Sequence, residues 1–135
     1  MEKREEKRNL ESIPVGSLRI IPLSSCKSLG EKVDSYLVKW RTERENEHKN
    51  SLAFAGYQRD SYILDARLPR FGSGEGKGEI KESVRGTDLF ILVDVCNYSL
   101  TYSMAGHENH MSPYDHYQDL KRVIAAVGGK ARRIT

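Results

Sequence analysis

The chain has 135 residues, of which 38% are hydrophobic and 30% are charged. This length is enough for one domain with a single core. No run approaches the roughly 18 apolar residues that cross a membrane, and the net charge of +3 comes from stretches, such as 2–8 and 39–49, that mix both signs. These features exclude a membrane span and a concentrated basic surface, so we expect neither a membrane nor a nucleic acid as a partner.

Residues 1–12 have too little apolar content to fold, and we predict a disordered charged tail before a domain that spans 13–135. The same segment lacks the apolar core of a secretory signal, which favours a cytoplasmic localisation. Cys26 and Cys96 do not form a C-x-x-C pair. In that compartment we expect both thiols to be reduced and inert.

The first predicted elements are a strand over 18–21, which Pro22 ends, and a helix after it. The helix is predicted from an apolar face with three- and four-residue spacing: Cys26, Leu29, Val33, Tyr36, Leu37 and Trp40. Ser28 and Glu31 have the spacing of a capping box, although an earlier serine could cap the helix. The polar stretch 41–50 either ends the helix or continues it into solvent.

A β-hairpin is predicted next, from an extended segment over 62–71 and a return strand over 79–83. Glycine occupies every second position from Gly72 to Gly78 in the connection between them. This connection matches neither the phosphate-binding P-loop pattern nor G-x-G-x-x-G, and no long helix follows it. The pattern therefore favours a flexible hairpin connection over a phosphate loop.

The strongest predicted strand covers 89–93, an uninterrupted apolar run typical of a parallel strand with both faces covered. Asp94 follows it, at the carboxyl end of the strand, where α/β proteins place ligands. A buried carboxylate there would need a partner or a cation. The same side chain could equally cap the loop.

Residues 96–111 are predicted to form a polar loop. Three histidines and three carboxylates in this loop and just after it raise the possibility of a metal site: His107, His110, His116, Glu108, Asp115 and Asp119. The carboxylates lack a recognised ligand spacing and His116 is expected to face away from the apolar stripe. We therefore assign no metal site, and interpret the histidines as surface groups or groups near a pocket.

The last predicted helix begins at Ser112 as N-cap, with Pro113 at its first position and Asp115 three residues after the cap. Its predicted apolar face is Tyr114, Tyr117, Leu120, Ile124 and Val127. Gly128 and Gly129 stop it, and 133–135 begin another strand. The order strand, helix, strand predicts an α/β fold with an open, mainly parallel sheet and flanking helices. Because the chain stops where that strand begins, we expect an incomplete, C-terminally truncated domain.

Several segments resemble the ribose-phosphate pyrophosphokinase (PRPP synthetase) family. Residues 79–91, E-I-K-E-S-V-R-G-T-D-L-F-I, are similar to the family segment E-I-x-E-S-V-R-G-x-D. Residues 71–75, F-G-S-G-E, are similar to its F-S-D-G-E or F-S-N-Q-E loop, and 131–135 are similar to its A-x-R-I-T. Residues 18–37 resemble its first strand and helix.

The resemblance implies a type I phosphoribosyltransferase-like fold and a ribose-phosphate diphosphokinase of nucleotide biosynthesis. Such enzymes use ATP, ribose 5-phosphate and Mg²⁺, and their homo-oligomers share the ATP site between subunits. By this resemblance Phe71 stacks on adenine, Glu75 or the nearby backbone bonds the base, and Ser73 replaces the family's Asp or Asn. Ser83 and Arg85 match the family's regulatory phosphate site. The family's catalytic residues belong beyond Thr135, so no catalytic residue is assigned and this stretch alone is expected to be inactive.

Two departures from the family keep other functions open. The segment 41–62 is longer than usual, and 96–111 replaces a compact turn. With the Ser73 substitution, they support an alternative hypothesis of a non-catalytic regulatory or interaction subunit. A third, weaker hypothesis is a small metal-binding module that uses His107 and His110.

Overall fold

The structure, a computed structural model, describes residues 15–47 and 59–135. The predicted tail, 1–12, lies outside the described residues. The elements in chain order are β1 (Ser17–Pro22), a short 3₁₀ turn (Ser24–Cys26), α1 (Lys27–Asn46), β2 (Ala66–Arg67), β3 (Glu79–Ile80), β4 (Thr87–Leu92), β5 (Thr101–Met104), β6 (His107–His110), α2 (Pro113–Val127) and β7 (Arg133–Ile134). None of the described helices is long and apolar enough to span a membrane.

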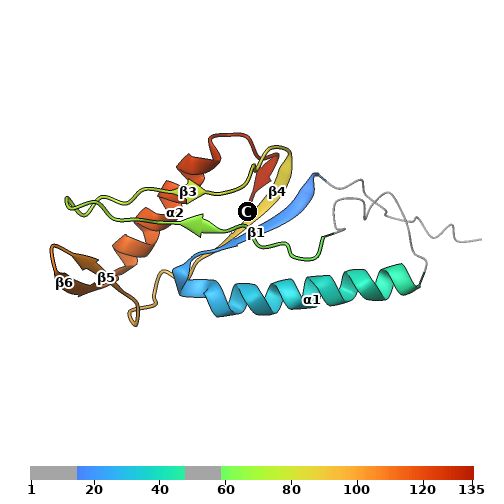
Figure 1. Cartoon of the computed structure of the whole chain (residues 1–135), viewed down its shortest axis with the longest axis horizontal. Coiled ribbons are helices and arrows are strands. Elements are labelled where there is room, and N and C mark those ends of the chain that lie inside the picture. Colours follow the sequence, from blue (N-terminus) through green and yellow to red (C-terminus); the bar gives the residue numbers. More distant parts are fainter. Residues whose placement is uncertain (1–14, 48–58) are drawn as a thin grey trace, which may run out of the picture.

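A parallel sheet with the order β1-β4-β7 forms the centre of the molecule (Figure 1). A further extended segment joins the free side of β1, where Ile20 donates to the carbonyl of Tyr62 and accepts from the amide of Leu64, each at 2.8 Å. Segments far apart in the sequence thus lie side by side, in parallel. The predicted α/β fold with an open parallel sheet, similar to an incomplete phosphoribosyltransferase-like domain, is confirmed.

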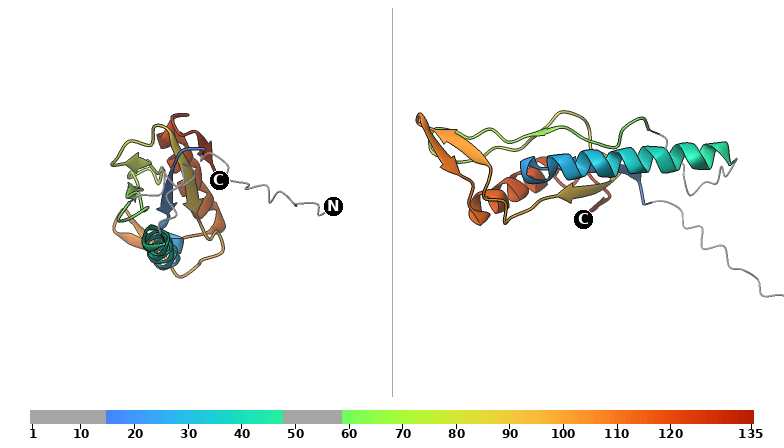
Figure 2. Two further views of the ribbon diagram at one scale, coloured as in Figure 1. Left: turned by 90° about the vertical axis from the view of Figure 1, so that its right-hand side faces the viewer. Right: turned by 90° about the horizontal axis from the view of Figure 1, so that it is seen from below.

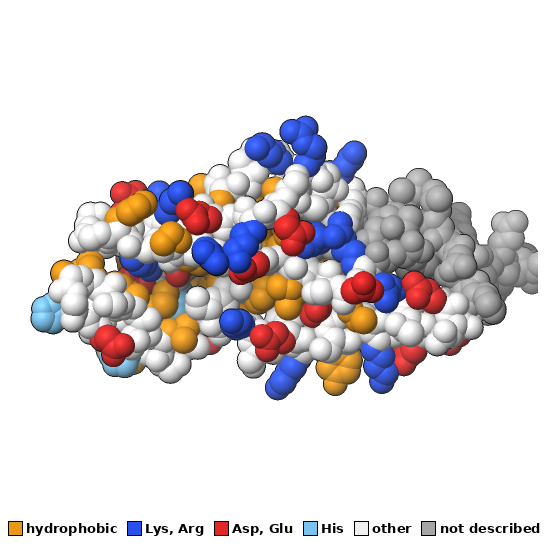
Figure 3. Space-filling model, in the orientation of Figure 1, with side chains coloured by type: hydrophobic (Ala, Val, Ile, Leu, Met, Phe, Trp, Pro, Cys, Tyr) orange, Lys and Arg blue, Asp and Glu red, His pale blue; other side chains and the backbone are white. Residues whose placement is uncertain are grey.

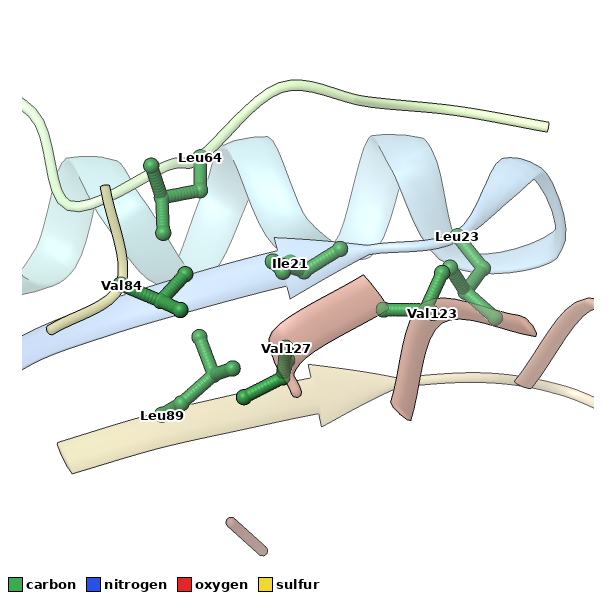
Figure 4. Close-up of a cluster of buried hydrophobic side chains, with 7 residues drawn as sticks. All are labelled: Ile21, Leu23, Leu64, Val84, Leu89, Val123 and Val127. Atoms are coloured by element: carbon green, nitrogen blue, oxygen red, sulfur yellow. The ribbon is translucent and has the colours of Figure 1, made fainter. Parts of the chain in front are cut away.

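Both faces of the sheet are covered, as the uninterrupted apolar strand predicts. On one face, side chains of β1, β4 and α2 meet those of three connecting segments. They form the cluster drawn in Figure 4: Ile21, Leu23, Leu64, Val84, Leu89, Val123 and Val127. On the other face, Leu18, Ile20 and Tyr62 pack against Val33 and Leu37 of α1. The alternation of β1 side chains between the two faces places the helices on opposite sides of the sheet.

The predicted start and apolar face of α1 need correction. The helix begins after Cys26, whose side chain makes no capping bond, so the proposed capping box at Ser28 and Glu31 is wrong: both residues lie inside the helix. α1 continues through the polar stretch to Asn46 and runs on past the sheet (Figures 1 and 2). Of the predicted apolar face, Leu29, Tyr36 and Trp40 are more than half exposed.

The start of α2 is confirmed, but its predicted apolar face is confirmed only at Leu120 and Val127, which pack in the core. Ser112 and Asp115 form the capping box, and Gly128 ends the helix with a φ of 59°. Tyr114 is 87% exposed, and Tyr117 and Ile124 are exposed too. Besides Val127, the buried residues of α2 are His116, Asp119 and Val123, none of which belongs to the predicted face. Two polar residues occupy this face because partners distant in sequence satisfy them, as described below.

Two β-hairpins accompany the sheet. β2 and β3 pair antiparallel, which confirms the predicted hairpin around the glycine-rich connection. The prediction of a loop over 96–111 is wrong, because β5 and β6 pair antiparallel within it. Their two-residue turn, Ala105-Gly106, has φ values of 51° and 80°, which is the geometry of a tight hairpin turn that follows the strand twist.

Candidate functional site

Three segments meet at the end of the molecule to which the carboxyl ends of β1 and β4 point: the tip of the β2–β3 hairpin, the β5–β6 hairpin and the first turns of α2 (Figures 1 and 2). Open parallel sheets place their ligands at this edge. Histidine side chains gather at the β5–β6 end of the face in Figure 3, whereas Lys, Arg, Asp and Glu are interspersed over the rest of it. We call residues 71–76 the Phe71 loop.

The Phe71 loop is a closed turn rather than an open strand connection. The amide of Phe71 donates to the carbonyl of Glu75, and the amide of Gly74 donates to the carbonyl of Phe71, each at 2.8 Å. Gly74 has a φ of 84°, a conformation that glycine adopts without strain. The turn leaves Phe71 51% exposed. The Phe71 ring is therefore accessible to solvent, while hydrogen bonds within the turn hold its backbone in place.

Arg70 ties this loop to α2. Its guanidinium donates to the carbonyl of Gly74 at 3.3 Å, to Oε1 of Gln118 and to Oδ1 of Asp119 at 3.0 Å. The Arg70 side chain is only 8% exposed, so these bonds are shielded from water and stronger than surface contacts. Gln118 also accepts from the amide of Gly76 at 3.1 Å. One arginine and one glutamine thereby hold both ends of the loop.

The other predicted nucleotide-contacting residues lie on the exposed side of the loop. Nη2 of Arg122 donates to Oε1 of Glu75 at 2.7 Å, in a pair that solvent reaches on both sides. The Ser73 hydroxyl accepts from the amide of Glu75 at 3.5 Å. Phe71, Ser73 and Glu75 thus share one short turn.

A buried polar cluster lies under the loop. His116 is 2% exposed and its Nε2 donates to the carbonyl of Asn97, so the expectation that it faces away from the core is wrong. Asp119 is 5% exposed. Burial raises the pKa of the Asp119 carboxyl above its usual value, although Arg70 and then His116 act in the opposite direction. The ion pair with Arg70 is what makes a carboxylate acceptable at this depth.

The predicted regulatory pair lies elsewhere. Ser83 and Arg85 follow β3 and precede β4, at the opposite end of the hairpin from the Phe71 loop (Figure 1). Both side chains are exposed, and the Ser83 hydroxyl accepts from the amide of Arg85 at 3.3 Å. Within one chain the structure does not bring this pair to the Phe71 loop.

The remaining candidates are placed as follows. Asp94 is exposed and accepts a hydrogen bond from the amide of Cys96 at 2.9 Å. Of the two roles considered for it, this geometry is that of a side chain that caps the loop. His110 stacks on Tyr98, with ring centroids 4.6 Å apart, whereas His107 lies at the exposed hairpin turn. Within residues 15–47 and 59–135, no three His, Cys, Asp or Glu side chains could hold a metal ion. Of the two cysteines, Cys26 is buried and Cys96 is exposed.

Sequence reasoning missed the residues that hold the site together. Arg70 is the residue before the recognised loop, Gln118 is not among the predicted site residues, and Asp119 was considered only as a metal ligand. The guanidinium of Arg70 also lies 4.9 Å from the centre of the Tyr102 ring. The strand that supplies Tyr102 did leave a signal in the sequence. Thr101-Tyr102-Ser103-Met104 alternate before Gly106, which is typical of a hairpin strand.

One family model matches most of the chain. The sequence model described as the N-terminal domain of ribose phosphate pyrophosphokinase matches residues 18–135. No curated protein and no solved structure matches the chain significantly. The matched range covers the parallel sheet, both helices and the Phe71 loop. The chain therefore belongs to the family of N-terminal domains of ribose phosphate pyrophosphokinases.

Proposed function

We propose that this chain is the N-terminal portion of a ribose-phosphate diphosphokinase. In that reaction the 1-hydroxyl oxygen of ribose 5-phosphate attacks the β-phosphorus of ATP and loses its proton. The bond from the β-phosphorus to the α–β bridging oxygen breaks, and AMP leaves. Family membership supports this proposal, and the observation that carries it is the half-exposed Phe71 ring on an anchored loop at the ligand-binding edge.

The role proposed for this chain is recognition of the ATP base. An aromatic side chain binds a base by stacking, which is worth about 1–3 kcal/mol. The Phe71 ring is free to stack because the loop turns it outward, and Glu75 and Ser73 flank it with acceptors and a hydroxyl. Because the ring points away from its own core, we propose that it completes the ATP site of a neighbouring subunit in a homo-oligomer.

Mg²⁺ is the expected cofactor, since phosphoryl transfer depends on cations around the transferring group. Among the described residues, no group of three or more His, Cys, Asp or Glu side chains could hold a metal ion. They do not fit a metal site, and we assign no metal ligand and no metal-dependent step to this part of the chain.

We propose a regulatory phosphate site at Ser83 and Arg85. The support is their exposure and the fork geometry of arginine, which suits phosphate oxygens. Inorganic phosphate should change the reaction rate of the wild-type enzyme, and Arg85→Ala should remove that response. An unchanged phosphate response in Arg85→Ala would exclude the site.

The test uses the protein as its natural gene encodes it, with ATP, Mg²⁺ and ribose 5-phosphate. We expect AMP to form only when ribose 5-phosphate is present. Phe71→Ala should raise the KM for ATP about tenfold, from the stacking energy above, and Phe71→Trp should retain the wild-type KM. Tyr36→Ala removes an equally exposed aromatic ring on α1 and is the matched control. AMP formation at the same rate with and without ribose 5-phosphate would overturn the proposal.

The second candidate is a non-catalytic subunit that regulates or binds a complete synthetase. The observations that favour it are Ser73 in place of the family's Asp or Asn and the β5–β6 hairpin in place of a compact turn. It predicts no AMP formation alone and co-assembly with an active synthetase. Activity of the isolated homo-oligomer would exclude it.

A further inference from the structure

The β5–β6 hairpin lies beside the tip of the β2–β3 hairpin in each view of the molecule (Figures 1 and 2). Along β5, exposed and half-buried residues alternate. The half-buried ones, Tyr102 and Met104, share one face because side chains alternate along a strand. That face is turned toward the Phe71 loop. A segment expected to be a polar loop is thus a two-stranded hairpin next to the candidate nucleotide contact.

Two contacts join this hairpin to the loop. The guanidinium of Arg70 lies 4.9 Å from the centre of the Tyr102 ring, within the range of a cation–π interaction. Sδ of Met104 approaches Gly74 so closely that a Cβ at position 74 would lie 3.0 Å from it. Tyr102 therefore contacts the residue that anchors the loop, and Met104 contacts the turn itself.

Arg70 transmits these contacts to the loop backbone. Its guanidinium plane is held on one side by the Tyr102 ring and along its edges by Gln118, Asp119 and the carbonyl of Gly74. The cation–π attraction strengthens when water is excluded, and the Arg70 side chain is only 8% exposed. Removing the ring would let water reach the guanidinium and would weaken its bond to the turn.

We propose that the β5–β6 hairpin sets the position of the Phe71 loop by covering Arg70, and that Tyr102 is a positioning residue for ATP recognition. This inference rests on the proposed function, because it takes the Phe71 loop as the adenine contact. Tyr102 acts through Arg70 and does not touch the nucleotide. The hairpin that distinguishes this chain from the compact family turn thereby tunes the affinity for ATP.

The test compares Tyr102→Leu with Tyr102→Phe in the full natural chain. The leucine keeps an apolar group and removes the aromatic face, whereas the phenylalanine keeps the face. We expect Tyr102→Leu to raise both the Kd and the KM for ATP about three- to tenfold, from the range of cation–π energies. The KM for ribose 5-phosphate and kcat at saturating ATP should not change. Tyr102→Phe should stay within about twofold of wild type, and Tyr114→Leu, at an 87% exposed position, is the matched control.

Hydrogen exchange separates loop positioning from general unfolding. Tyr102→Leu should speed amide exchange at Gly74 and Gly76, whose backbone groups bond Phe71 and Gln118, and should leave β1 and β4 protected. Unchanged exchange at these amides would overturn the inference. So would faster exchange with an unchanged KM for ATP, or a Tyr102→Phe variant as impaired as Tyr102→Leu.

The same experiment distinguishes the failure of this inference from failure of the proposed function. If the wild-type protein neither binds ATP nor makes AMP, the proposed function fails and the nucleotide role of Tyr102 fails with it. If the wild-type protein binds ATP and Tyr102→Leu binds it equally well, only the positioning role is wrong.

Discussion

Asp88 and Arg133 form a two-point ion pair between β4 and β7. Nε of Arg133 donates to Oδ1 of Asp88 at 2.8 Å, and Nη2 donates to Oδ2 at 2.6 Å. Asp88 is only 4% exposed. The parallel register places these two residues opposite each other. Their ion pair therefore links β7 to β4 at the edge of the sheet.

This pair predicts a measurable loss of stability. Arg133→Met should lower the free energy of unfolding by about 1–3 kcal/mol, because it leaves a buried carboxylate without its bidentate partner. The loss should stay below the value for a fully buried pair, since the Arg133 side chain is half exposed. Urea unfolding measures it. An Asp88→Asn/Arg133→Met double variant should lose less than the sum of the single losses, and strict additivity would show that the pair is not coupled.

The β2–β3 hairpin approaches the backbone of α2 closely at Gly78. A Cβ at that position would lie 2.3 Å from the carbonyl oxygen of Arg122, which belongs to the helix backbone and cannot turn aside. Gly78→Ala should therefore destabilise the fold by about 1–3 kcal/mol. Gly72→Ala is the control, since nothing lies within 4 Å of its Cβ, and it should change stability by less than about 0.5 kcal/mol. Equal unfolding midpoints for the two variants would contradict the close approach.

Two neighbouring residues test the buried face of α2. Val123 is fully buried, whereas Ile124 is 43% exposed. Val123→Ala should cost about 2–3 kcal/mol through lost burial and the cavity it leaves. Ile124→Ala removes more carbon but should cost less than about 1 kcal/mol. Thermal or urea unfolding ranks the two variants, and the reverse order would favour the face predicted from the sequence pattern.

Asp119 predicts how stability depends on pH. Its pKa is raised by burial above the usual value of 3.8, so the folded chain holds this proton to a higher pH than the unfolded chain does. Stability should therefore fall as the pH rises from about 3.8 through the raised pKa, because the native state binds more protons in that window. Below the pKa of the unfolded chain both states are protonated. The stability contribution of Asp119 is then fully present and no longer changes with pH.

Asp119→Asn isolates this contribution. The variant carries no titrating group there, so its stability relative to wild type should rise across the same pH window and then level off. Loss of the charged partner of Arg70 changes the free energy of unfolding of the variant by a similar amount at every pH. The diagnostic quantity is therefore how the difference in free energy between variant and wild type changes with pH. Urea unfolding at a series of pH values measures it. A difference that stays constant with pH would show that the Asp119 pKa is not raised.

Local patterns in the sequence predicted the central elements well. The apolar run at 89–93 indicated a strand covered on both faces, and the capping box of Ser112 and Asp115 located the start of α2. Each of these signals is complete within a few residues, because strand burial and helix capping depend on near neighbours. The recognised segments 71–75 and 79–91 likewise located the Phe71 loop.

The faces of the helices could not be predicted in the same way. His116 and Asp119 are polar, so an apolar pattern assigns them to solvent, and Tyr114 and Tyr117 to the core. The structure reverses this assignment because Asn97 and Arg70 satisfy the two polar side chains. Arg70 and Asp119 are 49 positions apart, and no local spacing reports such a meeting.

The sequence by itself determined the strands of the parallel sheet, the caps of α2 and the family, since these depend on apolar runs, caps and contiguous motifs, whereas it missed the β5–β6 hairpin. Only the tertiary structure decided how the Phe71 loop is held. That outcome depends on Arg70, Tyr102 and Asp119 converging from three separate segments. Burial makes each of these contacts strong, and burial at this point exists only once the two hairpins and α2 have packed together.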